Sequence, residues 1–237
     1  MQQSSPLKQL LDEEFEPLRR ASFAEEAAIR LRELILLEKL PPSCPINERE
    51  LSELLGISRT PVREAIRQLE IEGLVEYTQT RRPRIADPSM ATLEHWLAIQ
   101  GALEGLAGEL ACSRATDDEL SEIESLHVQM VERVDDPQRV ELFRIDMAFH
   151  GAIVAAAHNP PLVETHNQYN ARLWRARFIS SQRRANRELQ TSKHQDIVDA
   201  LLARDPERAS TALRSHLENA VSNIQAARRE REGAAEE

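Results

Sequence analysis

The chain has 237 residues, of which 41% are hydrophobic and only 4% aromatic, and it carries a formal net charge of −10. This length is enough for two modest domains, and an apolar set dominated by leucine and alanine favours helices packed on helices over a sheet protein. Two distant cysteines exclude a disulfide framework and a CxxC site, and no apolar run approaches the roughly 20 residues needed to cross a bilayer.

Residues 1–21 are expected to form a flexible tail. They contain no apolar run of the kind found in a secretory signal, so the protein is expected to stay in the cytoplasm. Ser22 and Glu25 have the spacing of a capping box, which predicts that a helix starts here. That helix is expected to run to about Leu40, where two consecutive prolines stop it.

A helix-turn-helix is predicted next. A short helix over 48–55, a glycine turn at Gly56 and a second helix over about 58–73 have the spacing of this motif. Two short strands follow, at 74–78 and 84–86, with a basic tip between them. Residues 22–87 are therefore expected to form one α+β domain.

The second helix of this motif has a basic face. Arg59, Arg63 and Arg67 recur every four residues, while apolar residues of the same helix must face the core. The free N–H groups of its first turn and the hydroxyls of Ser58 and Thr60 can hold phosphates and approach base edges. The alternative is that the arginines form a solvated face and the two helices are a packing motif, but the basic strand-turn-strand that follows favours DNA binding.

Residues 47–69, with the sequence NERELSELLGISRTPVREAIRQL, and the EGLV that starts at residue 72 resemble the winged helix-turn-helix of the GntR family. The resemblance covers about residues 22–87. It implies a DNA-binding regulator that acts as a homodimer on a short, nearly palindromic operator. It also implies that operator DNA is contacted by Arg49, Ser58, Arg59, Thr60 and Arg63.

The tip of the wing departs from the family pattern. Relatives usually have a glycine there that fits into the minor groove, whereas this chain reads QTRRP over residues 79–83. Insertion of Arg81 and Arg82 into a narrow minor groove is a hypothetical substitute for that contact.

Every segment from Met90 onward has helical periodicity. Short connections between consecutive helices imply antiparallel neighbours in a bundle. The fold is therefore predicted to be mainly α, with the winged domain joined through a hinge at 87–89 to a six- to seven-helix bundle. This bundle is assigned to residues 88–230, and residues 231–237 to a disordered tail. The six helices are expected at about 90–113, 117–134, 138–157, 161–180, 184–203 and 206–230.

Three of these helices direct ionisable groups to the bundle interior. Asp146 and His150 lie four residues apart on one apolar stripe, so both side chains can reach one point. His194 and His216 each share a face with apolar residues of a different helix. A shared metal ion would satisfy all four groups, and nitrogen-rich ligation favours Zn²⁺ as the leading assignment, with Ni²⁺, Co²⁺ or Mn²⁺ as alternatives.

The bundle also resembles the FCD domain of the FadR subfamily of GntR regulators. The motifs FRIDMAFH from residue 143, NPPL from 159, KHQDI from 193 and LRSHL from 213 carry the resemblance. Many members of this subfamily bind a divalent metal through one aspartate and three histidines. The resemblance implies a central cavity that holds the metal and a small-molecule effector, often a carboxylate.

The effector contacts are less clearly marked. Many relatives have an effector-pairing arginine near the position of Gln100, which here is a neutral amide on the inward stripe. Arg172 and Arg175 are candidates to supply the missing charge, although both also fit an ordinary surface position.

The sequence therefore predicts a transcription regulator controlled by an effector, and not an enzyme. Two alternatives remain open. One is the same regulator with a purely structural metal. The other is a metal-dependent, hydrolase-like enzyme, for which no pattern places a separate general acid or base beside the metal.

Overall fold

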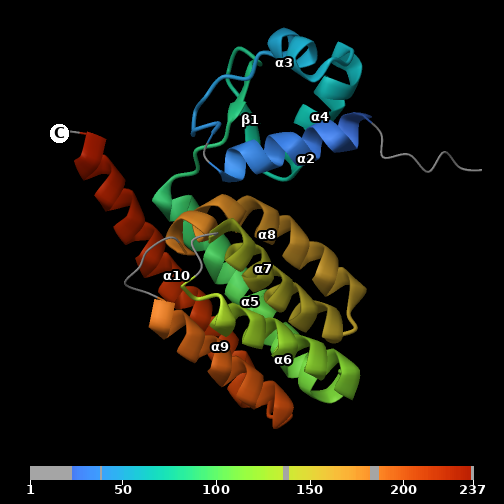
Figure 1. The fold of residues 1–237 in the computed structure, drawn as a ribbon, viewed down its shortest axis with the longest axis vertical. Coiled ribbons are helices and arrows are strands. Elements are labelled where there is room, and N and C mark those ends of the chain that lie inside the picture. Colours follow the sequence, from blue (N-terminus) through green and yellow to red (C-terminus); the bar gives the residue numbers. More distant parts are fainter. Residues whose placement is uncertain (1–22, 38, 136–138, 182–186, 236–237) are drawn as a thin grey trace, which may run out of the picture.

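The computed structural model describes residues 23–37, 39–135, 139–181 and 187–235. They form a small head, a short connection and an all-helical body (Figure 1). The predicted tail of residues 1–21 and Ser22 of the predicted capping box lie outside the described residues. No helix among the described residues is long and apolar enough to pass through a membrane.

The head contains three helices and a two-stranded antiparallel sheet, in which Val75 pairs with Ile85 and Glu76 with Arg84. Its core is built from α2, α4 and the sheet, with Leu31, Ile66 and Ile85 fully enclosed. The elements in order are α2 (Phe23–Leu36), α3 (Glu48–Leu55), α4 (Arg59–Ile71), β1 (Val75–Tyr77) and β2 (Pro83–Ile85).

The first helix ends earlier than predicted. It stops at Leu36, not at Leu40. The N–H of Leu40 instead donates to the carbonyl of Leu34 at 3.1 Å, which closes a turn after the helix. Pro41 keeps the chain from continuing as a helix at Leu40, because a proline disfavours helical backbone in the residue before it.

The turn between α3 and α4 forms as its residues predict. Asn47 caps α3, since its side chain accepts hydrogen bonds from the backbone N–H groups of Arg49 and Glu50. Gly56 ends the helix in the left-handed region, at φ 66°, where a side chain would be strained. Ser58 then starts α4 from an extended conformation.

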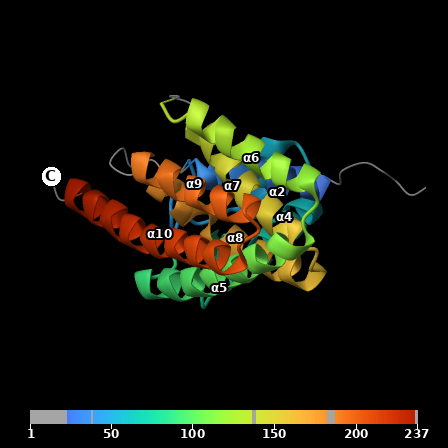
Figure 2. The same ribbon diagram turned by 90° about the horizontal axis from the view of Figure 1, so that it is seen from below.

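The body is a bundle of helices that begins with α5 (Figures 1 and 2). The helices α5 and α10 form its most extensive pair. Gly108 of α5 permits this close approach, because an added Cβ would lie 2.5 Å from Leu213 Cδ1. The body helices are α5 (Met90–Arg114), α6 (Asp117–Glu132), α7 (Arg139–Ala156), α8 (Pro160–Ser181), α9 (Arg187–Leu202) and α10 (Pro206–Ala235).

The last helix is longer than predicted. It continues to Ala235, so residues 231–235, which were expected to belong to a disordered tail, are helical. The reason is that four of these five residues are good helix formers, which outweigh Gly233, and no proline interrupts the segment. The prediction of a tail from residue 231 was therefore wrong for these five residues.

The head rests on one end of the body, with α2 facing α8 (Figure 1). Arg144 of α7 lies 3.2 Å from Glu33 of α2 in an exposed ion pair. Leu37 packs against an apolar cluster of the body that includes Phe143. The predicted hinge is tied to the far end of α10, because Arg228 donates a hydrogen bond of 2.7 Å to the carbonyl of Pro88.

Candidate nucleic-acid interface and metal centre

The arginine stripe of α4 faces solvent. Arg59, Arg63 and Arg67 are exposed, while Val62 and Ile66 on the opposite face are fully buried. The structure therefore confirms the predicted division of this helix into a core face and a basic face. The other end of the helix points toward the body, where Gly73 approaches Arg172.

The first turn of α4 leaves its polar groups available. Ser58 occupies the N-cap position, but its side chain makes no capping hydrogen bond. Thr60 is exposed beside it. Backbone N–H groups at a helix N-terminus, together with the positive end of the helix dipole, attract phosphate. The geometry of this turn suits contact with a nucleic-acid backbone.

Two predicted contact arginines are held by acidic neighbours at the surface. The Nε of Arg63 lies 2.6 Å from Glu48 Oε2, and the Nε of Arg49 lies 3.7 Å from Glu53 Oε1. The two arginine side chains nevertheless remain 64% and 68% exposed, respectively. Exposed ion pairs contribute little free energy, so phosphate oxygens can replace these carboxylates.

The wing tip presents two arginines on a tight turn. The N–H of Arg81 donates to the carbonyl of Thr78 at 2.8 Å, and the N–H of Thr78 donates to the carbonyl of Arg82 at 2.9 Å. Both arginines are exposed. Arg81 has a φ of 56°, in the left-handed region that glycine adopts more easily. The wing tip thus places a cation at a backbone position that would favour glycine.

The four predicted metal ligands come together in the body. Asp146 and His150 lie on α7, His194 on α9 and His216 on α10, and one ligand atom from each lies within 4.8 Å of all the others. The Nε2 of His194 is 3.1 Å from Asp146 Oδ1, and the Nε2 of His150 is 3.8 Å from the same oxygen. Three helices therefore converge on one point.

The donor set fits a transition metal. All three imidazoles are buried. Within the described part of the chain, His150 Nε2 and His216 Nδ1 have no hydrogen-bond partner. Buried polar atoms without partners are costly, and a cation between them would satisfy both. Three nitrogens and one carboxylate oxygen match the ligands preferred by Zn²⁺ and its neighbours in the periodic table.

Local electrostatics keeps these groups in their metal-binding forms. Burial lowers the pKa of His150 and, more strongly, that of His216, so both imidazoles stay neutral. Burial alone would raise the pKa of Asp146, but the neighbouring His194, His150 and Arg177 outweigh it and lower that pKa below its usual value. A metal requires neutral imidazoles and an ionised carboxylate.

A second layer of charged groups surrounds the centre, and the sequence analysis missed it. Glu104 of α5 is buried, with Oε2 2.8 Å from His150 Nδ1 and Oε1 3.2 Å from His166 Nε2. Arg177 of α8 is buried as well, 3.5 Å from Glu104 and 3.9 Å from Asp146. Burial raises the pKa of Glu104, but His150, His166 and Arg177 together lower it well below its usual range. The residue is therefore an ionised carboxylate that orients His150.

Helical periodicity contained a signal for these residues. His166, Leu173 and Arg177 recur at i, i+7 and i+11, which places them on one stripe of α8. Glu104 follows Gln100 by four residues on the inward stripe of α5. His166 is buried, and its Nε2 lies 3.2 Å from Glu104 Oε1 within the charged cluster.

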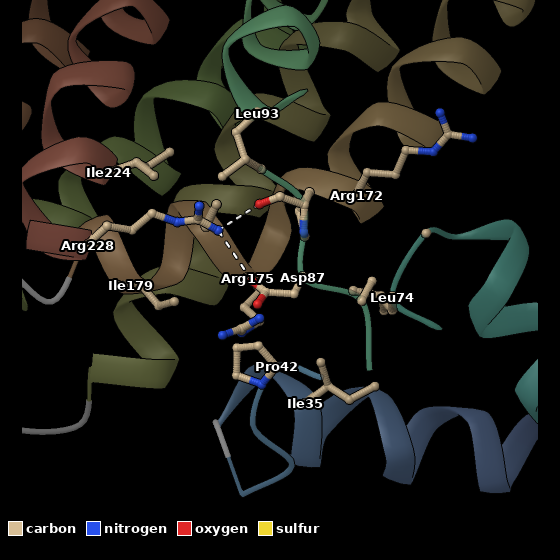
Figure 3. A pocket seen from close by; sticks show the side chains of 14 residues that line it. Ile35, Pro42, Leu74, Asp87, Leu93, Arg172, Arg175, Ile179, Ile224 and Arg228 are labelled. Carbon is tan, nitrogen blue, oxygen red and sulfur yellow. Dashed lines mark hydrogen bonds and ion pairs between the residues drawn. The ribbon is translucent and has the colours of Figure 1, made fainter. Parts of the chain in front are cut away.

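The predicted effector residues lie in two different places. Gln100 is fully buried, as expected, and its Nε2 donates to Glu104 Oε1 at 3.3 Å. Arg172 instead stacks over the rings of Trp96 and Tyr169, and Arg175 lines a cavity between head and body (Figure 3).

The reason is the position of the two arginines around α8. At about 100° per residue, Arg172 and Arg175 lie roughly 140° and 200° from Arg177, which faces the centre. The structure therefore does not bring Arg172 and Arg175 to the metal centre. Among the residues that the structure describes, Arg177 is the arginine beside it.

Comparisons with known proteins agree with this two-part organisation. Residues 23–85 match the family model described as bacterial regulatory proteins of the gntR family, and residues 95–219 match the FCD domain model. The chain is 32% identical over 194 residues to a probable repressor of a D-xylose utilization operon from Paenarthrobacter nicotinovorans, covering 80% of this chain and 85% of the relative. It is 28% identical to the Glc operon transcriptional activator of Escherichia coli, with 86% and 90% covered.

The fold has solved counterparts. The structure of Escherichia coli McbR/YncC aligns with a TM-score of 0.75 at 20% identity, over 87% of this chain and 99% of that one. A GntR regulator from Rhodococcus aligns with a TM-score of 0.73 at 23% identity, over 87% and 99%. At these identities the likeness concerns the fold alone.

Proposed function

Because the chain belongs to the GntR family of bacterial regulatory proteins and carries an FCD domain, we propose that its affinity for operator DNA is controlled by a small carboxylate bound at a divalent metal in the body. Its relatives are transcriptional regulators, so the chain is a regulator with a DNA-binding head and an effector-binding body, and not an enzyme. The metal, the carboxylate and the coupling between them are the proposed part.

One observation carries the proposal. Four ligand atoms from three helices lie within 4.8 Å of one another in the interior of the body. Zn²⁺ is the leading candidate, with Ni²⁺, Co²⁺ or Mn²⁺ as alternatives. When bound, such an ion supplies positive charge to a carboxylate. Arg177 and Gln100 stand beside the centre as further partners for an acidic effector.

The head is proposed to read DNA as one half of a homodimer. A two-fold symmetric pair of heads matches the two halves of a nearly palindromic operator. In this proposal Arg49, Ser58, Arg59, Thr60 and Arg63 contact one half-site in the major groove. Arg81 and Arg82 reach the adjacent minor groove, and loss of preference for an A/T-rich flank in Arg81→Ala would check that contact.

The charged cluster argues against a hydrolase. Hydrolysis at a metal is assisted by a free general base that takes a proton from the attacking water. Glu104 is the buried carboxylate next to the centre, and it is already engaged by His150, His166 and Arg177. It therefore orients a ligand instead of accepting a proton from water.

The test is to remove single ligands. His194→Ala and His216→Ala are each expected to lose most of the bound metal, measured by elemental analysis of the purified protein. His95→Ala removes an exposed histidine of α5 and is expected to retain one equivalent. If His194→Ala and His216→Ala each retained a full equivalent of bound metal, the shared metal centre would be refuted.

A second arm separates an effector-binding metal from a purely structural one. The wild-type protein is stripped with a chelator, reloaded with Zn²⁺ and titrated with a panel of small carboxylates while operator binding is followed. We expect at least one carboxylate to change operator affinity only in the reloaded protein. A metal that restores stability while no carboxylate changes operator affinity would favour the structural alternative.

A further inference from the structure

The cavity lined by Arg175 lies at the junction of head, hinge and body, away from the metal centre. It has a volume of about 250 Å³. Its walls come from Ile35 and Leu74 of the head, Asp87 of the hinge, and Arg175, Ile224 and Arg228 of the body (Figure 3). A molecule bound here would touch all three parts of the protein at once.

The polar side of this cavity carries more positive than negative charge. Arg228 lies 3.5 Å from Asp87 and also donates a hydrogen bond to Pro88, while Arg175 approaches Asp87 from another side (Figure 3). Among the described residues that line the cavity, Asp87 is the carboxylate, and Arg172, Arg175 and Arg228 are the cations. Burial lowers the pKa of Arg175, and the nearby Arg228 lowers it further, although Asp87 opposes this. Guanidinium groups that face a cavity attract an anion bound inside it.

The remaining walls are apolar. Leu93, Ile224 and Ile35 are almost fully buried, and Pro42 and Ile179 extend the same surface. At roughly 30 Å³ per water, the cavity holds the equivalent of about eight water molecules. This is space for a small organic acid. Guanidinium groups recognise carboxylate and phosphate oxygens, and apolar walls take up a hydrocarbon part.

We propose that this cavity is a binding site for a small organic anion with an apolar portion, which Arg175 and Arg228 hold by its charged end. The site is distinct from the metal centre. Because the walls of the cavity belong to head, hinge and body, an anion bound there stabilises the position of the head seen in this structure over other positions of the head. Binding itself does not depend on the proposed metal or carboxylate effector; only its consequence for operator affinity rests on the proposed function.

The first experiment measures binding without DNA. The full-length protein is titrated with benzoate, hexanoate and inorganic phosphate by calorimetry, and tryptophan fluorescence is recorded in parallel. Trp96 stacks with Arg172 next to the cavity, and Trp174 packs in the junction cluster with Leu37, so both report on this region. We expect benzoate or hexanoate to bind and change the fluorescence, and phosphate to bind more weakly.

Substitutions then locate the site. Arg175→Met keeps a long side chain but removes the charge, and is expected to weaken binding at least about tenfold, the value of one charge-assisted hydrogen bond. Ala176→Leu fills the cavity without altering any charge and is expected to abolish binding. Arg30→Met, which removes an exposed arginine of α2, serves as the matched control. Circular dichroism shows whether each variant is folded.

The metal centre is separated from this site by two comparisons. His216→Ala and the chelated wild-type protein are both expected still to bind benzoate. The proposal would be overturned if His216→Ala and the chelated protein both lost benzoate binding. It would also be overturned if Arg175→Met and Ala176→Leu bound benzoate as well as the wild type does, or if none of the three probes bound. Phosphate binding as tightly as the two carboxylates would overturn its apolar part.

Discussion

At the scale of single residues, Arg63 is the side chain whose role in DNA reading is easiest to isolate. It is exposed, and it forms an ion pair with Glu48 on the preceding helix. Arg63→Ala is expected to weaken specific operator binding by at least about 1 kcal/mol while leaving the fold intact, because an exposed ion pair adds little stability. Electrophoretic titration with operator DNA measures this change.

Arg30→Ala is the matched control for that measurement. It removes another exposed arginine with an acidic partner, but from α2, outside the helix-turn-helix. The affinity of this variant for operator DNA is expected to equal that of the wild type. Equal footprints for Arg63→Ala and the wild type would contradict the assignment of α4 as the reading helix.

Glu104 offers a second prediction at this scale. Its carboxylate contacts the ring nitrogen of His150 that faces away from the other ligands. Such partners orient metal-binding histidines, and their removal costs about 10- to 100-fold in metal affinity. Glu104→Gln is therefore expected to bind Zn²⁺ that much more weakly in a competition titration with a chelating dye. Glu109→Gln, on the same helix but exposed, is expected to bind normally.

At the scale of elements, the turn after α4 controls how the head meets the body. Gly73 has a φ of 74°, and an added Cβ would lie 2.7 Å from Cγ of Arg172. Gly73→Ala is expected to lower the free energy of unfolding by about 1–2 kcal/mol, because alanine is strained in this region. Denaturant titration gives the energy, and a shift in Trp96 fluorescence reports displacement of Arg172.

Gly151→Ala is the opposite case. Gly151 lies inside α7, and an added Cβ there meets nothing within 4 Å. Alanine is favoured over glycine in a helix, so this variant is expected to gain up to about 1 kcal/mol. Destabilisation by both substitutions to a similar extent would show that the effect at Gly73 has nothing to do with its conformation.

Most elements could be predicted from the sequence, because their signals are local. Gly56 marks the turn of the helix-turn-helix, and the spacing of Asp146 and His150 places both on one face. The early end of α2 was not predicted, since it depends on a backbone hydrogen bond from Leu40 to Leu34. Arg177 was overlooked because an arginine is ordinarily exposed, and only its partners on other helices explain its burial.

At the scale of the whole molecule, the metal is expected to contribute to stability. A ligand present at 100 times its dissociation constant stabilises the folded state by about 2.7 kcal/mol. For a protein of this size, each kcal/mol shifts Tm by about 2–4 °C, so chelation is expected to lower Tm by about 5–10 °C. Differential scanning calorimetry before and after chelation checks this. If chelation lowered the Tm of His216→Ala by as much as that of the wild type, the chelator would be acting at a different site.

The placement of the head on the body could not be predicted. It depends on contacts between residues far apart in sequence, such as Arg144 with Glu33 and Arg228 with Pro88, which are 111 and 140 positions apart. No periodic pattern encodes such pairs. The same limit applies to Arg172 and Arg175, whose charge was noticed but whose location depends on where the head docks.

The length of α10 has one further consequence. The same uninterrupted helix carries His216 in the interior of the body and Arg228 against the hinge, about 18 Å away along its axis. A helix resists both stretching and compression, so it acts as a strut between these two positions. Any displacement of its inner end must appear at the outer end, beside Asp87, without passing through a loop where it would be absorbed.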